Sequence, residues 1–303
     1  GTMRENVLAL EVVTASGEVI RTGTRARKSS AGYDLTRLFV GSEGTLGVIT
    51  EITLRLYPLP EAVSAAICSF PGIAEAVATV IQTIQLGVPI ARVELLDART
   101  VAAVNRHSNL KLREAPLLLM EFHGSPASVK EQAETVQAIA DEHGGAGFEW
   151  ADTPEERTRL WTARHKAYFA GVQSRPGCRC ITTDVCVPIS RLADAVLASV
   201  EEADASGIPY FLVGHVGDGN FHMGYLIDPD DDDERARAEQ LNHQVVSRAL
   251  ALGGTCTGEH GVGLHKMGFL LDEAGAGAVA LMRTLKQALD PDNILNPGKV
   301  LAP

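Results

Sequence analysis

Apolar positions along this chain recur with two different periods, and each period predicts its own kind of element. Over six stretches the apolar residues return every three to four positions, which is typical of helices that bury one face. In the third stretch Thr153 is followed three residues later by Glu156, the spacing of a capping box, so a helix should begin there. The predicted helices span residues 73–85, 128–143, 153–170, 192–205, 234–252 and 274–289.

Short β-prone runs between and before these helices predict strands. They cover residues 7–13, 18–21, 48–56, 88–95, 117–122 and 184–188, with a further pair at 211–213 and 225–227. Because no long strand–helix–strand repeat is present, we expect a mixed α+β fold, in which helices cover one face of an antiparallel sheet. Pro58 and Pro60 end the first group of strands. They set a predicted domain boundary between residues 1–60 and 61–303.

The strongest turn signal lies in the stretch GHVGDGNFH, which starts at Gly214. With Asp218 and Gly219 as a two-residue loop, His215 faces His222 across a hairpin. Directly opposed side chains share one face, with Cβ atoms about 5 Å apart. Two imidazoles so placed can bind one divalent metal ion, although a plain cross-strand contact gives the same pattern.

A second glycine-flanked motif, Glu259-His260, follows later in the chain and offers a carboxylate and a third imidazole. Glycines on both sides allow the backbone to bend sharply and to approach a ligand closely. Together with the hairpin, this motif favours a site that binds a metal and moves a proton.

Composition and charge narrow the classes of function. The formal net charge is −11, which argues against a nucleic-acid partner because phosphate binding needs a basic face. No apolar run is long enough for a transmembrane segment, and no export leader is found. We therefore expect a cytoplasmic location, with peripheral attachment to a membrane left open. The five cysteines are expected to be reduced and structural, with a soft metal site at Cys178, Cys180 and Cys186 as the alternative.

Several motifs, in one consistent order along the chain, resemble the FAD-linked oxidase family. That family has a flavin domain of the vanillyl-alcohol oxidase type, followed by the FAD-linked oxidase C-terminal domain. Its members include D-lactate dehydrogenase (cytochrome) and the glycolate oxidase flavoprotein subunit. The motifs are GSEGTLGVIT from Gly41, LWTAR ending at Arg164, the His215 hairpin, TGEHG from Thr257 and NPGKV from Asn296.

The resemblance implies an activity and its cofactors. FAD would oxidise a small D-2-hydroxy acid, D-lactate or glycolate, to the 2-oxo acid. The electrons would pass to a cytochrome, a quinone or an electron-transfer protein, and not to NAD. A divalent metal (zinc, manganese or iron) would be held by His215, His222 and Glu259, with His260 as the base beside the flavin.

The resemblance also assigns residues to substrate and flavin. Arg164 matches an arginine that grips the substrate carboxylate; without the resemblance it would be a surface residue on an amphipathic helix. The cofactor contacts would come from Gly44, Gly47, Ile49 and Asn296, with the tail at residues 290–303 returning to the flavin site. A turn ahead of Pro297 is the alternative for Asn296.

The chain also departs from the family pattern. The smaller N-terminal lobe that carries the main pyrophosphate loop is expected to be absent, which would leave residues 1–60 as the remnant of an FAD-binding domain that holds FAD weakly. Relatives acting on larger diacids carry lysine and asparagine where this chain has Thr182 and Gly224, which favours a small monocarboxylate. Two alternatives stay open: a non-catalytic metal-binding substrate domain or subunit of a split flavoprotein, and a metal hydrolase.

Overall fold

The computed structural model describes residues 2–26 and 28–302, which fall into two compact units. The first, called here the sheet unit, is Leu59–Thr255; the second, the split unit, combines Gly1–Pro58 with Cys256–Pro303. The two ends of the predicted domain ranges, residues 1 and 303, lie outside the described residues, as does residue 27.

The sheet unit is built on a sheet with the strand order β7-β4-β6-β5-β10-β11-β8, and β9 pairs with β11. Among the described residues, neighbouring strands of this sheet run antiparallel, which confirms the predicted sheet. The strands are β4 (Ala62–Ser69), β5 (Arg92–Leu96), β6 (Leu117–Gly124), β7 (Ala146–Ala151), β8 (Arg179–Thr182), β9 (Val185–Cys186), β10 (Tyr210–Gly214) and β11 (Asn220–Ile227).

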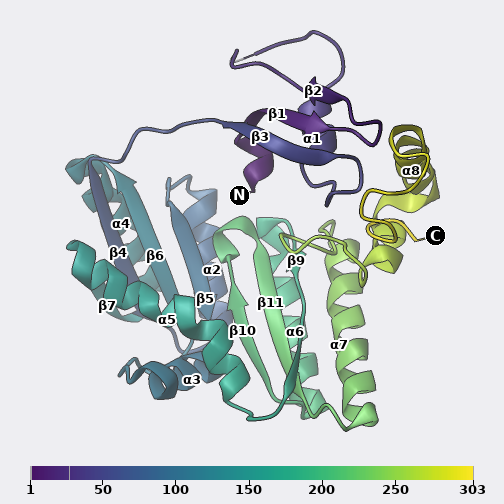
Figure 1. Ribbon diagram of the computed structural model, residues 1–303. Helices are drawn as coiled ribbons and strands as arrows, with labels where there is room; N and C mark the ends of the chain where they lie inside the picture. The colour runs from purple at the N-terminus through teal and green to yellow at the C-terminus, as the bar shows by residue number, and fades with distance from the viewer. Residues whose placement is uncertain (1, 27, 303) are drawn as a thin grey trace. The chain divides into compact units, whose positions relative to one another are not determined.

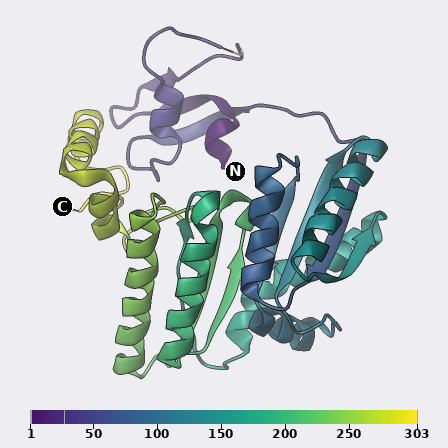
Figure 2. The same cartoon turned by 180° about the vertical axis from the view of Figure 1, so that it is seen from behind.

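Helices cover both faces of this sheet, and not one face as predicted (Figure 1). Helices α3 and α5 lie on one face, and α2, α4, α6 and α7 lie on the other, as Figure 2 shows from behind. The reason is in the central strands, where β10 and β11 are buried along their whole length and so need cover on both sides. The helices are α2 (Ile73–Gln85), α3 (Ala98–Ser108), α4 (Pro126–Glu142), α5 (Pro154–Gln173), α6 (Leu192–Ser206) and α7 (Asp232–Ala251), with the 3₁₀ turns η2 (Ile189–Arg191) and η3 (Val216–Asp218).

The capping box correctly predicted where α5 begins. At α5 both halves of the capping box form: the Thr153 hydroxyl accepts the backbone N–H of Glu156, and the Glu156 carboxylate accepts the N–H of Thr153. Helix α3 was not predicted, although Asp97 caps it by accepting the N–H of Thr100. Its short sequence has only a narrow apolar face, which the periodicity does not separate from a loop.

The predicted register of the His215 hairpin is wrong by two residues. Strand β10 ends at Gly214, and Val213 lies opposite His222. The chain needs a longer turn, because residues 216–218 form η3 and Gly219 closes it with a φ of 80°. A Cβ on Gly219 would lie 2.1 Å from a backbone oxygen, so the turn admits only glycine there. Since a shift by an even number keeps each side chain on its own face, His215 and His222 still lie near each other.

The split unit has its own small sheet and core. The strands β1 (Val7–Val13), β2 (Val19–Arg21) and β3 (Val48–Leu54) pair antiparallel in the order β2-β1-β3. Leu289, at the end of α8 (Met267–Leu289), packs with the buried side chains of β1. Helix α8 breaks at Gly275 (φ 77°), which is why the period predicted only its second part. The unit also contains η1 (Met3–Glu5) and α1 (Leu35–Phe39).

Candidate metal and substrate site

Two imidazoles meet in the sheet unit where β10 turns into β11. His215 directly follows β10, and His222 lies within β11. Their ring centroids are 5.9 Å apart and the rings are nearly perpendicular, at 88°. A ring nitrogen of one lies within 4.8 Å of a ring nitrogen of the other. His222 is buried, and His215 keeps about a third of its side-chain surface exposed (34%), so the pair is reachable from one side.

The contacts of His215 define which of its nitrogens carries the proton. Its Nδ1 lies 2.6 Å from Oε1 of Glu94, and its Nε2 lies 3.2 Å from Nη2 of Arg164. A carboxylate only accepts and a guanidinium only donates. We therefore assign His215 as a neutral imidazole with N–H at Nδ1 and the lone pair at Nε2.

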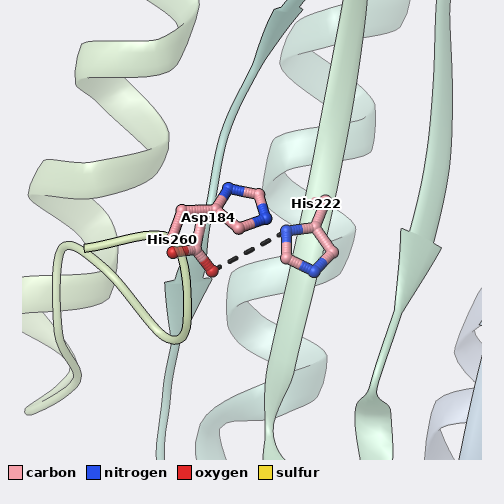
Figure 3. A group of neighbouring side chains, drawn as sticks. All are labelled: Asp184, His222 and His260. Atoms are coloured by element: carbon pink, nitrogen blue, oxygen red, sulfur yellow. Dashed lines mark ion pairs between the residues drawn. The ribbon is translucent and has the colours of Figure 1, made fainter. Parts of the chain in front are cut away.

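His222 is oriented in the same way by the segment before β9. Its Nδ1 lies 3.2 Å from the backbone oxygen of Thr183 and 3.7 Å from Oδ1 of Asp184, the contact that Figure 3 marks with a dashed line. Both partners accept, so Nδ1 carries the proton here too. Asp184 is fully buried and also accepts the amide N–H of Asn220 at 2.9 Å.

This arrangement fits a metal ion on chemical grounds. Metal-binding histidines almost always donate their other N–H to a carboxylate or backbone carbonyl, which fixes the ring and its tautomer. His215 has Glu94 in that position, and His222 has the Thr183 carbonyl. Two neutral imidazoles with the lone pair at Nε2 are suitable ligands for zinc, manganese or iron, and such a site needs at least one further ligand.

Arg164 extends from α5 to the same place. Its Nε donates to Oε2 of Glu94 at 2.8 Å, and its side chain is only 17% exposed. The alternative that Arg164 is a surface residue of an amphipathic helix is therefore wrong. Glu94 holds one edge of the guanidinium, and the terminal nitrogens lie on the side of His215. They are suited to a carboxylate, although that role stays a prediction.

Three residues of this site were not predicted from the sequence: Glu94, Asp184 and Asn220. Glu94 is the only acidic residue in the five-residue strand β5, and its side chain is 6% exposed. A buried carboxylate is rare unless it is paired, so one acid within an apolar strand was a usable signal. Asp184 stood at the start of a predicted strand, but local pattern gave no indication of its burial.

The predicted flavin-binding residues lie in the split unit. Glu43 has a φ of 53°, and its carboxylate accepts the backbone N–H groups of Val262 (2.7 Å) and Gly263 (2.8 Å). The Asn296 amide donates to the Glu43 carbonyl at 2.6 Å, beside Gly44. The loop with Gly44, the segment after His260 and the tail are thus held together within this unit. Contact of Gly44 and Asn296 with the flavin stays a prediction.

The remaining predicted residues of the split unit have less specific surroundings. Gly47 packs against the core, since a Cβ there would lie 2.5 Å from Val12. Ile49 lies in β3 and is 39% exposed. Glu259 and His260 are about half exposed and lie 3.6 Å apart through Oε1 and Nε2. Because they belong to the split unit, their place in the metal site stays a prediction.

The fold and this constellation define the class: an α+β domain with paired imidazoles and an arginine at one end of an antiparallel sheet. Residues 59–300 match the family described as "FAD linked oxidases, C-terminal domain", and the chain belongs to that family. The resemblance found in the sequence is confirmed.

Curated relatives match over almost the whole chain. The probable mitochondrial D-lactate dehydrogenase of Danio rerio is 51% identical over 99% of this chain and 61% of its own length. The mitochondrial D-lactate dehydrogenase [cytochrome] of Arabidopsis thaliana is 48% identical over 100% of this chain and 53% of its own length. The glycolate oxidase subunit GlcD of Bacillus subtilis is 38% identical over 100% and 64%. The chain thus spans between half and two thirds of the length of these relatives.

Solved structures with low sequence identity share the fold. A 4-ethylphenol oxidase from Gulosibacter chungangensis matches with a TM-score of 0.72 at 17% identity, covering 98% of this chain and 66% of its own. A p-cresol methylhydroxylase matches with a TM-score of 0.73 at 16% identity, covering 98% and 65%. Among the described residues, no helix has the length and apolar character needed to cross a membrane.

Proposed function

We propose that the protein containing this chain is a flavin-dependent dehydrogenase that oxidises a small D-2-hydroxy acid, D-lactate or glycolate, to the 2-oxo acid with the help of a divalent metal. One observation carries the proposal: the buried carboxylate of Glu94 binds both His215 and Arg164. His222 lies beside His215. The names of relatives that are 51% and 38% identical support the substrate class.

The chain's own residues would hold the metal and the substrate. His215 and His222 would bind the metal through Nε2, and at His215 the metal would replace the hydrogen bond from Arg164 Nη2. Glu259 would supply the carboxylate ligand, as the sequence motif suggests. FAD would supply a two-electron acceptor, and zinc, manganese or iron would supply a Lewis acid that lowers the pKa of the substrate hydroxyl. Arg164 would take the substrate carboxylate through its terminal nitrogens and so fix the orientation of the α-carbon.

His260 is proposed as the proton acceptor for the substrate hydroxyl. Imidazole suits this task because its pKa lies close to neutral pH. Gly44, Gly47, Ile49 and Asn296 are proposed to contact the flavin, with Asn296 held in place by the carbonyl of Glu43. The electrons would leave to a cytochrome, a quinone or an electron-transfer protein.

Packing near the site supports a small substrate. Thr182 and Gly224, the two positions where relatives acting on diacids carry lysine and asparagine, lie directly opposite each other on β8 and β11. The ring of Phe211 fills the space above Gly224, where a Cβ would lie 2.3 Å from it. A long polar side chain is therefore excluded at position 224, which supports a substrate with a single carboxylate.

Stopped-flow reduction of the flavin tests this proposal. With oxygen excluded, D-lactate or glycolate should reduce the flavin of the intact protein, and L-lactate should not. Treatment with a strong chelator should remove the reduction, and adding back zinc, manganese or ferrous iron should restore it. Unchanged reduction after the metal has been removed, as measured by elemental analysis, would contradict the role of the metal. No reduction by any 2-hydroxy acid in the metal-loaded, flavin-loaded protein would contradict the activity.

A further inference from the structure

We propose that Glu94 is a positioning residue that joins the metal ligand His215 to the substrate-binding Arg164, so that metal affinity and substrate affinity depend on the same carboxylate. This inference rests on the function proposed above. It assigns a role to a residue that sequence motifs do not indicate, and it follows from the contacts of one buried side chain.

The position of Glu94 is fixed by the sheet. Strand β5 lies between β6 and β10, and Glu94 pairs with Leu119 of β6. Its side chain is 6% exposed, and both carboxylate oxygens are used. Oε1 accepts from Nδ1 of His215 at 2.6 Å, and Oε2 accepts from Nε of Arg164 at 2.8 Å. A carboxylate held on an interior strand therefore fixes two side chains from two other elements.

Each contact has a separate chemical effect. At His215 the carboxylate holds the proton on Nδ1, which places the lone pair on Nε2 and makes that nitrogen a stronger ligand. At Arg164 it takes the Nε edge, so the guanidinium turns its terminal nitrogens toward His215 Nε2, where Nη2 lies at 3.2 Å. A 2-hydroxy acid carries its carboxylate next to its hydroxyl, so it can contact Arg164 and a metal on His215 at once.

The same sheet offers a matched control. Glu121, on the neighbouring strand β6, also joins an arginine to a histidine: it lies 2.8 Å from Nη2 of Arg92 and 2.8 Å from Nε2 of His123. Burial raises the pKa of Glu121, but these two partners lower it, with a net decrease. Glu121→Gln removes the same kind of bridge without touching His215 or Arg164.

The test compares Glu94→Gln with Glu121→Gln in the intact protein. A glutamine has an NH2 group, which only donates, in place of one of the two carboxylate oxygens. It therefore loses the acceptor that faces either His215 or Arg164. We expect Glu94→Gln to weaken zinc or manganese binding, measured by calorimetry against a chelator, by roughly 10–100-fold. We expect kcat/KM for D-lactate to fall by about 10²-fold even at saturating metal, because the arginine is misplaced. Glu121→Gln should change neither value by more than about twofold.

Three results would overturn the proposal. Normal metal affinity with a normal kcat/KM in a folded Glu94→Gln protein would do so. Equal losses in both variants would show a general effect on the sheet, and not positioning. Nitrogen-15 NMR of the unmutated protein gives a third readout, which is independent of activity. The His215 resonances, assigned with His215→Gln, should show N–H at Nδ1, and an Nε2–H tautomer would refute the role of Glu94 even if the proposed oxidation fails.

Discussion

At the scale of single residues, the sequence indicated which side chains come together at the proposed site but not how they are oriented. His215, His222 and Arg164 were predicted from motifs, because turn residues and family patterns are local. Glu94 was missed because it is 121 positions from His215 and meets it only through the pairing of β5 with β10. The tautomer of each imidazole depends on such distant partners, and so no local pattern contains it.

Arg164→Lys should weaken substrate binding. A lysine provides a single charged point, and it cannot hold Glu94 and a carboxylate with separate edges. We expect KM for D-lactate to rise by roughly 10–100-fold, since a hydrogen bond to a charged group contributes about 1.5–3 kcal/mol. Steady-state kinetics measure this, with Arg159→Lys on the exposed side of the same helix as control. A KM that changes as little as in the control would contradict the assignment.

At the scale of elements, periodicity predicted helices better than strands. Helix α2 has the predicted bounds, and α5 begins at the predicted cap. Strands β4, β7 and β8 were not predicted. Strand β11 was predicted only over residues 225–227, because it is buried on both faces and shows no alternation. The hairpin register was wrong because the Asp218-Gly219 pair belongs to a longer turn with η3, whose shape depends on contact with Val187.

Gly224→Ala should destabilise the sheet unit, because its Cβ would lie 2.3 Å from the Phe211 ring. Overpacking in a core typically costs about 1–3 kcal/mol of unfolding free energy. Urea unfolding followed by tryptophan fluorescence measures it, since both tryptophans, Trp150 and Trp161, lie in the sheet unit. Gly217→Ala is the control, with only ordinary contacts at 3.5 Å or more. In the Phe211→Leu background, Gly224→Ala should lower the unfolding free energy by less than it does in the unmutated protein. If the effects of the two substitutions simply add, the clash with Phe211 is contradicted.

At the scale of the whole molecule, the order of the motifs along the chain identified the family. Local sequence patterns did not predict that segments from both ends of the chain form one unit. Lys286 donates to the carbonyl of Thr45, which is 241 positions away, and to Asp290 and Leu295 in the tail. These contacts join both ends of the chain in one unit. The predicted domain ranges 1–60 and 61–303 stay a prediction.

Asp290 should make the split unit sensitive to acid. Burial raises the pKa of Asp290. The Lys286 ammonium and the N–H groups of Leu295 and Ile294 lower this pKa by more than burial raises it, so the net shift is downward. Because the folded pKa lies below the unfolded value of about 3.9, the carboxylate stabilises the fold above that value. This contribution is lost as the pH falls through the folded pKa.

Thermal unfolding between pH 3 and pH 7 tests this dependence. Asp290→Asn should lower the melting temperature most at pH 7, and the difference from the unmutated protein should shrink steadily below about pH 4. The exposed Asp292→Asn serves as control and should follow the unmutated protein throughout. A difference between Asp290→Asn and the unmutated protein that stays constant across this range would show that the charge of Asp290 contributes nothing.

The central claim is that His215 and His222 bind a metal through Nε2 while Glu94 accepts a hydrogen bond from Nδ1 of His215. A crystal structure of the intact protein grown with manganese, with data collected to reveal the anomalous signal of that metal, tests it most directly. We expect an anomalous peak about 2 Å from Nε2 of both imidazoles, with Glu94 still hydrogen-bonded to Nδ1 of His215 and to Arg164. A peak bound through Nδ1, or full manganese occupancy at a place away from both rings, would contradict it.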